Sequence, residues 1–284
     1  MIRPRTLVLS LTAALFVLLP FAAQAQSAEA GTLSVMSYNI RNGEANDGTS
    51  SWPFRASASR QMIEDQLPDV MGVQEAYLYQ CAFLKEYCRG YKWIGVGREN
   101  GRKEGEIMAI FYRTSKIKVL KWGTFWLSDT PKKASLGWDA ACKRTATWAL
   151  MKSKKTGQKF YMVNTHLDHV GWEAREKGLQ LIVERIAEMN TKGYPVVVTG
   201  DFNMTPERKE FAPLKKSFFD ARETAFQTDH LATFHGWGKE DTQIIDYIFY
   251  QGFSSCISYE TLRKGYADRK FISDHYPVKA LLVF

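Results

Sequence analysis

Short apolar runs alternate with polar, glycine-containing segments along most of the chain. The clearest helical pattern covers residues 172–189, where Leu179, Ile182, Val183 and Ile186 recur at helical spacing. Two further helices are predicted at residues 54–66 and 76–87. Strands are predicted at residues 33–40, 69–74, 91–96, 107–112, 117–127, 145–151, 160–164, 195–199, 244–250, 256–262 and 278–284.

This irregular alternation of strands and helices, with long polar loops between them, is typical of an α/β (α+β) protein. It predicts two packed mixed sheets with helices outside them. Residues 26–284 contain no internal repeat, no low-complexity tract and no linker rich in proline or serine. We therefore expect one domain over residues 26–284.

Residues 1–25 have a different pattern from the rest. Arg3 and Arg5 precede an almost wholly apolar run at residues 7–21, and Ala23-Gln24-Ala25 follows it. This order is typical of a signal peptide. An uncleaved membrane anchor is the alternative, but the run is shorter than the roughly 20 residues that span a bilayer. We expect cleavage after Ala25, export to the periplasm or the medium, and no transmembrane segment in the mature chain.

Net charge and cysteine content give only weak information on partners and disulfide pairing. The formal charge is +8, of which the leader arginines supply two, and a basic excess suits a phosphate-bearing partner. In an exported chain, Cys81, Cys88, Cys142 and Cys256 allow three complete disulfide pairings. Cys81 and Cys88 would lie roughly 10 Å apart on one unbroken helix, which is too far for a disulfide. The sequence predicts no protein partner, and we expect a monomer.

Several predicted strands run into clusters of Asp, Asn, Glu or His. Strand ends are where α/β folds gather ligand-binding groups, so these clusters could meet in one cleft. They lie at residues 37–41, 73–75, 163–168, 198–203, 245–247 and 273–277.

The chemistry of these clusters indicates metal-assisted hydrolysis of a phosphate ester. Oxygen ligands favour Mg²⁺, Mn²⁺ or Ca²⁺ over zinc, and His166 and His275 add groups that titrate near neutrality. Such a site can activate a water molecule and stabilise the phosphoryl oxygens. The candidate oxygen ligands are Asn39, Glu75, Asp201, Asn203 and Asp274.

The ordered set of motifs resembles the endonuclease/exonuclease/phosphatase superfamily. It comprises Gly-Asp-Phe-Asn at residues 200–203, Ile-Asp-Tyr-Ile at 245–248 and Ser-Asp-His-Tyr-Pro-Val at 273–278. The resemblance covers Leu33 to Phe284. It implies a four-layer αββα sandwich of two mixed sheets, with the active cleft at one end.

The resemblance also implies which residues serve the metal. Asn39 and Glu75 resemble the metal-site pair of the family, with Glu75 the principal ligand. Asp274 resembles an acid linked to the metal or to water. His166 resembles the histidine that contacts the scissile phosphate or protonates the leaving oxygen. From the residue type alone, Asn39 could instead cap a strand or turn.

The remaining family roles concern the water and the transition state. Asp201 resembles the carboxylate that orients or deprotonates the attacking water, and Asn203 helps to hold that water or the phosphate. Asp246 resembles the carboxylate that orients His275, and His275 resembles the histidine that stabilises the transition state. Asp246 could also cap a turn.

Four further residues are candidates for substrate binding. Arg41 and Asp168 lie beside predicted site residues, and Arg144 could bind phosphate through its planar fork. His235 precedes the Ile-Asp-Tyr-Ile strand, where members of the family often have substrate-facing loops. Arg41, Arg144 and Asp168 could equally be structural.

The sequence favours a phosphodiesterase acting on nucleic acid or another phosphodiester. Lys132, Lys133, Lys143 and Arg144 lie in one stretch, and basic groups near tryptophans suit a nucleic-acid strand. A phosphomonoesterase for a sugar phosphate, nucleotide or lipid headgroup is the alternative, because it would use the same catalytic set. A non-catalytic phosphate-binding module is a remote third possibility. A closed pocket would favour small phosphates, whereas an elongated basic groove would favour polymers.

Overall fold

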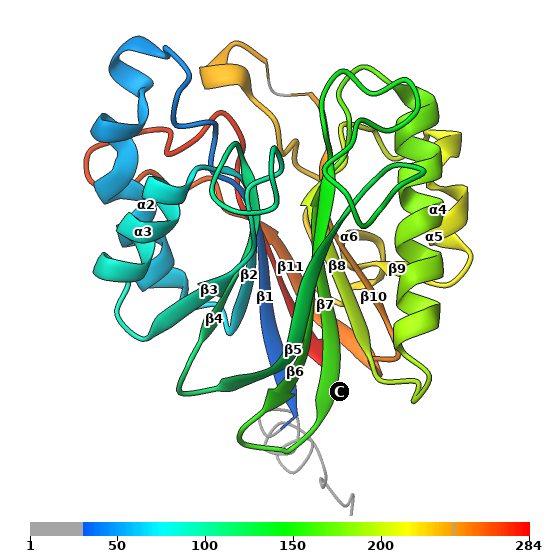
Figure 1. The fold of residues 1–284 in the computed structure, drawn as a ribbon. Coiled ribbons are helices and arrows are strands. Elements are labelled where there is room, and N and C mark those ends of the chain that lie inside the picture. The colour runs from blue at the N-terminus through cyan, green and yellow to red at the C-terminus, as the bar shows by residue number, and fades with distance from the viewer. Residues whose placement is uncertain (1–30, 241) are drawn as a thin grey trace, which may run out of the picture.

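The computed structural model describes residues 31–240 and 242–284 (Figure 1). The predicted signal peptide and the first residues of the expected domain lie outside the described residues. Within the described ranges, no helix has the length and apolar character needed to cross a bilayer.

The first sheet has the strand order β11-β12-β1-β2-β4-β3. β1 and β2 are parallel, and the other neighbouring strands are antiparallel, so the sheet is mixed. Its strands are β1 (Thr32–Asn39), β2 (Val70–Ala76), β3 (Tyr91–Ile94), β4 (Ile107–Arg113), β11 (Ser255–Thr261) and β12 (Val278–Val283).

The second sheet has the order β5-β6-β7-β8-β10-β9. It is also mixed, because only β7 and β8 are parallel among its neighbouring strands. Its strands are β5 (Ile117–Trp126), β6 (Thr145–Ser153), β7 (Lys159–His166), β8 (Val196–Asp201), β9 (Phe219–Asp220) and β10 (Asp246–Gln251).

Helices cover the outer faces of both sheets (Figure 1). α2 (Trp52–Gln66) and α3 (Leu78–Tyr87) pack on the first sheet, and α4 (Trp172–Met189) packs on the second. The four-layer sandwich expected from the sequence is confirmed. Short helical segments complete the fold: α5 (Ala212–Lys215), α6 (Ala221–Thr224), η1 (Gly48–Ser50), η2 (Lys209–Phe211) and η3 (Gly236–Gly238).

β2 and β7 are among the strands that continue further than predicted, and both carry site residues at their ends. β2 runs through Glu75 to Ala76, because an irregularity in its pairing with β4 after Val73 lets the strand continue. β7 includes His166, which pairs with Asp201 in the parallel register. Glu75 and His166 therefore lie within paired strands rather than on loops.

None of the four cysteines forms a disulfide in the structure. Cys81 lies on α3, and Cys88 is the residue that follows the last turn of that helix. Burial raises the pKa of the Cys81 thiol above its usual range, and it raises that of Cys88 to about 12.

The core between the two sheets changes character along each strand. On β7, Phe160 and Met162 pack in the apolar cluster shared by the two sheets, whereas Asn164 and His166 follow at the same alternate spacing. All four side chains are buried. The same change from apolar to polar occurs along β1, β2 and β8. The polar ends lie together at one end of the sandwich.

Candidate active site

A cavity of about 550 Å³ lies at this polar end, between loops from both sheets. It brings together most of the residues that the sequence singled out. The predicted residues that line it are Arg41, Glu75, Arg144, His166, Asp201, Asn203, Asp274 and His275.

Asn39 joins the acids of the two sheets. Its Nδ2 donates to Glu75 Oε1 at 2.9 Å and to Asp201 Oδ2 at 2.9 Å. Its Oδ1 accepts the backbone N–H of Arg41 at 2.9 Å, which fixes the orientation of the amide. The oxygen is therefore turned away from the acids. Asn39 thus bridges two carboxylates, and its membership of the metal-site pair stays a prediction.

Glu75 lies in a backbone conformation that few side chains adopt, with φ of 62°. The pairing irregularity in β2 turns its carboxylate toward the cavity, and the backbone N–H of Asn42 donates to Oε2 at 2.6 Å. Strain of this kind persists only where the surroundings fix it. The fold thus holds one half-buried carboxylate at the cavity floor.

The donor set around Glu75 fits a hard divalent cation. Glu75, His166 and Asp201 each offer a ligand atom, and these atoms lie within 4.8 Å of one another. Asp274 lines the same cavity, where burial raises its carboxyl pKa and the charge of Glu75 raises it further. A cation would relieve the repulsion between these acids, and carboxylates with room for water and phosphate suit Mg²⁺.

His275 and Asp246 form the predicted pair. His275 Nδ1 lies 2.8 Å from Asp246 Oδ2, and its Nε2 lies 3.7 Å from Asp201 Oδ2. Burial alone would lower the pKa of His275, but the charges of Asp246 and Asp201 raise it well above the ordinary value. These charges favour the protonated form of His275, and the contact with Asp246 holds its ring in one orientation.

Asp201 has the properties of a general base. Burial raises its pKa to about 7, while the His275 charge opposes the rise. Its Oδ1 accepts the backbone N–H of Asn203 at 2.9 Å, which leaves Oδ2 facing Asn39 and the two histidines. A carboxylate with a pKa near neutrality can take a proton from water efficiently.

His166 is neutral in this arrangement. Asn203 Nδ2 lies 2.9 Å from His166 Nε2, and it also donates to the carbonyl oxygen of Leu167 at 3.0 Å. His166 Nε2 therefore accepts. Burial lowers the pKa of His166 well below its usual value, and the Arg144 charge lowers it further. Its predicted role, to contact the scissile phosphate or to protonate the leaving oxygen, stays a prediction.

Of the substrate-binding candidates, the two arginines lie in the cavity wall. Arg41 Nη1 is 3.4 Å from Asp274 Oδ2, and Arg41 also pairs with Asp47 at 3.0 Å. Arg144 is buried, and its Nε lies 3.2 Å from Asp168 Oδ2. Both guanidinium groups are held by carboxylates and face the space that a phosphate would occupy.

Asp168 and His235, two further substrate-binding candidates, are not among the residues that line the cavity. Asp168 is buried behind Arg144 and accepts the backbone N–H groups of Ala141, Val170 and Gly171. His235 is also buried, and its ring lies 4.3 Å from that of Phe271 and 4.2 Å from that of Tyr276. Both residues shape loops around the cavity.

The structure adds wall residues that the sequence analysis missed. Glu106 pairs with Arg98 at 2.6 Å and accepts from Asn42 Nδ2 at 3.3 Å, and Gln243 lies on another wall. Glu106 directly precedes β4, which is antiparallel to β2, so its start lies beside the end of β2. Only this pairing places Glu106 at the site. An acid before a strand has no distinctive sequence signal, so the sequence analysis did not identify it.

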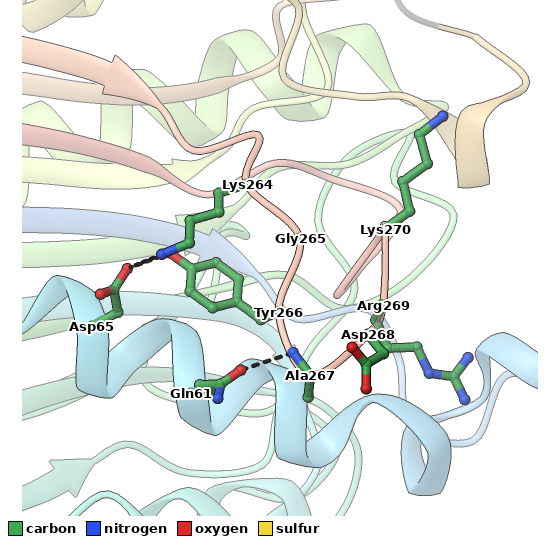
Figure 2. A pocket seen from close by; sticks show the side chains of 9 residues that line it. All are labelled: Gln61, Asp65, Lys264, Gly265, Tyr266, Ala267, Asp268, Arg269 and Lys270. Carbon is green, nitrogen blue, oxygen red and sulfur yellow. Dashed lines mark hydrogen bonds and ion pairs between the residues drawn. The ribbon is translucent and has the colours of Figure 1, made fainter.

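A second hollow, of about 600 Å³, lies between α2 and the loop at residues 264–270 (Figure 2). Lys264 Nζ is 3.2 Å from Asp65 Oδ2, and Gln61 accepts the backbone N–H of Ala267 at 2.8 Å. None of the predicted catalytic residues lines this hollow. Its contacts attach the loop to α2.

Two packed mixed sheets carry acids and histidines around a cavity at their shared end, and this donor set could hold a metal ion. Residues 36–275 match the Endonuclease/Exonuclease/phosphatase family. The chain belongs to this family, and it is a phosphoester hydrolase.

Solved structures of similar proteins agree with this assignment. A mannosyl-6-phosphatase of Bacteroides thetaiotaomicron is 36% identical, and the match covers 89% of this chain and 100% of that chain with a TM-score of 0.84. The catalytic domain of human nocturnin, solved with bound sulfate, shares the fold at 20% identity, 89% and 94% coverage and a TM-score of 0.70. An uncharacterized protein of Acanthamoeba polyphaga mimivirus is 25% identical over 80% of this chain and 90% of that protein.

Proposed function

We propose that this protein is a divalent-metal-dependent phosphomonoesterase that removes phosphate from a phosphorylated sugar. The observation that carries the proposal is the wall of the cavity. Glu106, Arg98, Asn42 and Gln243 offer hydrogen-bonding groups next to the catalytic acids. Sugar hydroxyl groups need such partners. The 36% identity to a mannosyl-6-phosphatase supports the same substrate class.

The structural support for a nucleic-acid substrate is weaker than the sequence indicated. Lys143 Nζ binds Glu99 Oε2 at 3.0 Å, and Arg144 is buried against Asp168, so neither extends a basic groove. Among the described residues that line the cavity, Phe234 is the only Phe, Tyr or Trp, and its ring lies 4.9 Å from that of His275. Base stacking therefore lacks a platform. Phosphodiester hydrolysis, which the sequence analysis favoured over phosphomonoester hydrolysis, is the alternative to this proposal.

The mechanism assigns a separate task to each residue. When bound by Glu75 and Asp274, a divalent cation such as Mg²⁺ would hold and polarise the phosphate oxygens. Asp201 accepts a proton from the attacking water, whose oxygen forms the new bond to phosphorus. The bond from phosphorus to the sugar oxygen breaks, and that oxygen takes up a proton from water. His275 stabilises the added negative charge.

A substrate panel tests this proposal with the purified protein. Mannose 6-phosphate, glucose 6-phosphate and p-nitrophenyl phosphate are compared with bis-p-nitrophenyl phosphate, single-stranded DNA and RNA, with Mg²⁺ and with excess chelator. We expect phosphate release from the sugar phosphates, at a higher kcat/KM than for any diester, and loss of activity in chelator. Cleavage confined to the diesters, with a steep salt dependence, would favour the alternative.

A matched pair of variants links the measured activity to this cavity. Asp201→Asn removes the base, whereas Asp220→Asn makes the same change at a buried aspartate that caps α6 and does not line the cavity. We expect phosphate release to fail only in Asp201→Asn. Equal activity in both variants would place the reaction elsewhere.

We also propose that the protein is exported and acts in the periplasm or the medium. The support is the order of charged, apolar and small residues at positions 3–25. N-terminal sequencing of protein recovered from outside the cytoplasm should find Gln26 as the first residue. Recovery of cytoplasmic protein that begins at Met1 would contradict export.

A further inference from the structure

Arg55 is a buried guanidinium that no step of the proposed mechanism uses. It lies in the first turns of α2, and it is only 1% exposed. Guanidinium groups are almost never fully buried without partners, because they carry five N–H donors and a permanent charge. The partners of Arg55 therefore indicate what it does.

The partners of Arg55 are backbone carbonyl groups at the rim of the active site. Nη1 donates to the carbonyl oxygens of Ile40 and Ile272, the latter at 3.4 Å, and Nη2 donates to that of Arg41 at 3.0 Å. Nε donates to the carbonyl oxygen of Ser50 at 2.9 Å. One side chain thus holds two segments that are 232 positions apart in sequence, at Ile40 and Ile272.

Both segments lead directly to groups of the proposed metal site. Residues 39–42 supply Asn39, which donates to Glu75, and the Asn42 N–H, which donates to the other Glu75 oxygen. The segment after Ile272 supplies Asp274 and His275. A further bond, from Ser273 Oγ to the carbonyl oxygen of Asn39 at 2.7 Å, also joins the segments. Their separation therefore sets the distance between Glu75 and Asp274.

Aromatic rings fix the guanidinium itself. Its central carbon lies 5.1 Å from the ring centroid of Trp52 and 5.8 Å from that of Trp237, within the usual cation–π range. α2 is also attached to the chain just before Ile272, through the contacts of Gln61 and Asp65 with residues 264–267 (Figure 2). The helix is thus a rigid support for both segments.

We infer that Arg55 is a positioning residue for the metal site. It holds the segment that donates to the Glu75 carboxylate and the segment that carries Asp274 at the spacing a divalent cation requires. The inference rests on the metal site of the proposed function. Arg55 touches neither substrate nor metal and acts through the carbonyl groups of Ile40, Arg41 and Ile272. Without it, each of these buried carbonyls loses a donor, although Tyr38 still donates to Ile272 and Gln80 to Arg41. The two segments are then joined less firmly.

The test is Mn²⁺ affinity, measured by electron paramagnetic resonance on the substrate-free protein. Arg55→Met keeps an unbranched side chain but removes charge and donors. Loss of an outer-shell partner typically costs about 10- to 100-fold in metal affinity, and we expect the Mn²⁺ dissociation constant to rise by this factor. Arg55→Lys keeps the charge but loses the planar fork, so we expect a smaller rise. At saturating Mn²⁺, both variants should regain most of the wild-type kcat.

Arg222→Met is the matched control. Arg222 is also a buried arginine, and it binds Asp220 and Glu223 on α6 without lining the cavity. Its loss should lower the melting temperature and leave Mn²⁺ affinity unchanged. Wild-type affinity in folded Arg55→Met would overturn the inference, as would equal weakening in Arg222→Met. If Arg55→Met does not fold, wild-type affinity in Arg55→Lys overturns it. Failure of the wild-type protein to bind Mn²⁺ would instead overturn the metal site, and this inference with it.

Discussion

The core between the two sheets has an apolar half and a polar half, built from the same strands. The apolar half contains Leu33, Val35, Val70, Phe160, Met162 and Val197, which belong to one buried cluster. The polar half contains Ser37, Gln74, Asn164 and Thr199, which are equally buried but lie one or two alternate positions nearer the active site. The side chains are equally buried in both halves, but those of one half are apolar and those of the other are polar.

Asn164 is the centre of the polar half. Its Nδ2 donates to the carbonyl oxygens of Val73 and Ala109, each at 2.9 Å. Its Oδ1 accepts from Gln74 Nε2 at 2.7 Å and from Thr199 Oγ1 at 3.1 Å. These four bonds use the full capacity of the amide and connect β7 with β2, β4 and β8.

The difference between the halves shows how two sheets can share one active site. Apolar packing is not directional, so it stabilises the sandwich without fixing how one sheet lies on the other. Hydrogen bonds are directional, and those of Asn164 reach β2 immediately before the irregularity that carries Glu75. The polar half thus sets Glu75, on the first sheet, relative to His166 and Asp201 on the second.

The largest expected effect on turnover is at Glu75, one of the ionisable residues that lie beyond the polar half. Glu75→Gln keeps the size of the side chain but removes the charge that binds the cation, so we expect nearly complete loss of turnover. The melting temperature should change little, because Glu75 is only half-buried. Steady-state assays and thermal melts check this, with Glu64→Gln on the exposed face of α2 as the control. Turnover close to wild type in Glu75→Gln would remove Glu75 from the site.

Asp201 and His275 should show the next largest effects. Asp201→Asn removes the base and His275→Ala removes the cation, so we expect each to lower kcat by roughly 10²- to 10⁴-fold. Because the two groups act in the same step, the double variant should lose far less than the product of the single losses. A full product, measured by the same assay, would mean that the two groups act independently.

A change in the polar half should affect stability and activity together. Asn164→Leu removes the amide donor to two buried carbonyl groups and one acceptor of Gln74, which keeps its bonds to Ser37 and Gly72. A buried polar group left without a partner costs about 1–3 kcal/mol. The shift of Glu75 should also lower kcat, by up to about 100-fold for a displacement near 1 Å. Chemical denaturation and kinetics measure the two effects. Unchanged kcat in a folded, destabilised variant would break the link between this half and the site.

A change in the apolar half should affect stability alone, and it has the smallest expected effect on turnover. Met162→Ala creates a cavity and should lower the free energy of unfolding by about 2–5 kcal/mol. We expect kcat to stay at the wild-type value, since the Met162 side chain, unlike that of Asn164, holds no group near Glu75 by a hydrogen bond. A fall in kcat as large as that of Asn164→Leu would show that the two halves do not differ in this respect.

The strand pattern predicted much of this arrangement. Alternating burial and polar strand ends are local features, so Glu75, His166, Asp201 and His275 could be brought to one cleft from sequence and family resemblance. Other properties depend on partners far away in sequence. The orientation of the Asn39 amide follows from the Arg41 N–H, and sequence cannot show it.

Three further features could not be predicted for related reasons. Glu106 reaches the cavity only because β4 pairs with β2, and strand pairing is not local. Asp168 and His235 were expected to face substrate, but polar residues beside a site can equally hold its loops. The sequence did not single out Arg55, because an arginine near a helix start is usually exposed.

The central claim is that Glu75 and Asp274 hold a divalent cation at the end of the sandwich. The most direct test is a crystal structure of the protein with Mn²⁺, using anomalous scattering to locate the ion. The account predicts a peak in the 550 Å³ cavity, roughly 2 Å from a Glu75 carboxylate oxygen, that disappears in Glu75→Gln. A peak at Cys142, Asp168 and His169 instead, or none at full Mn²⁺ saturation, would contradict it.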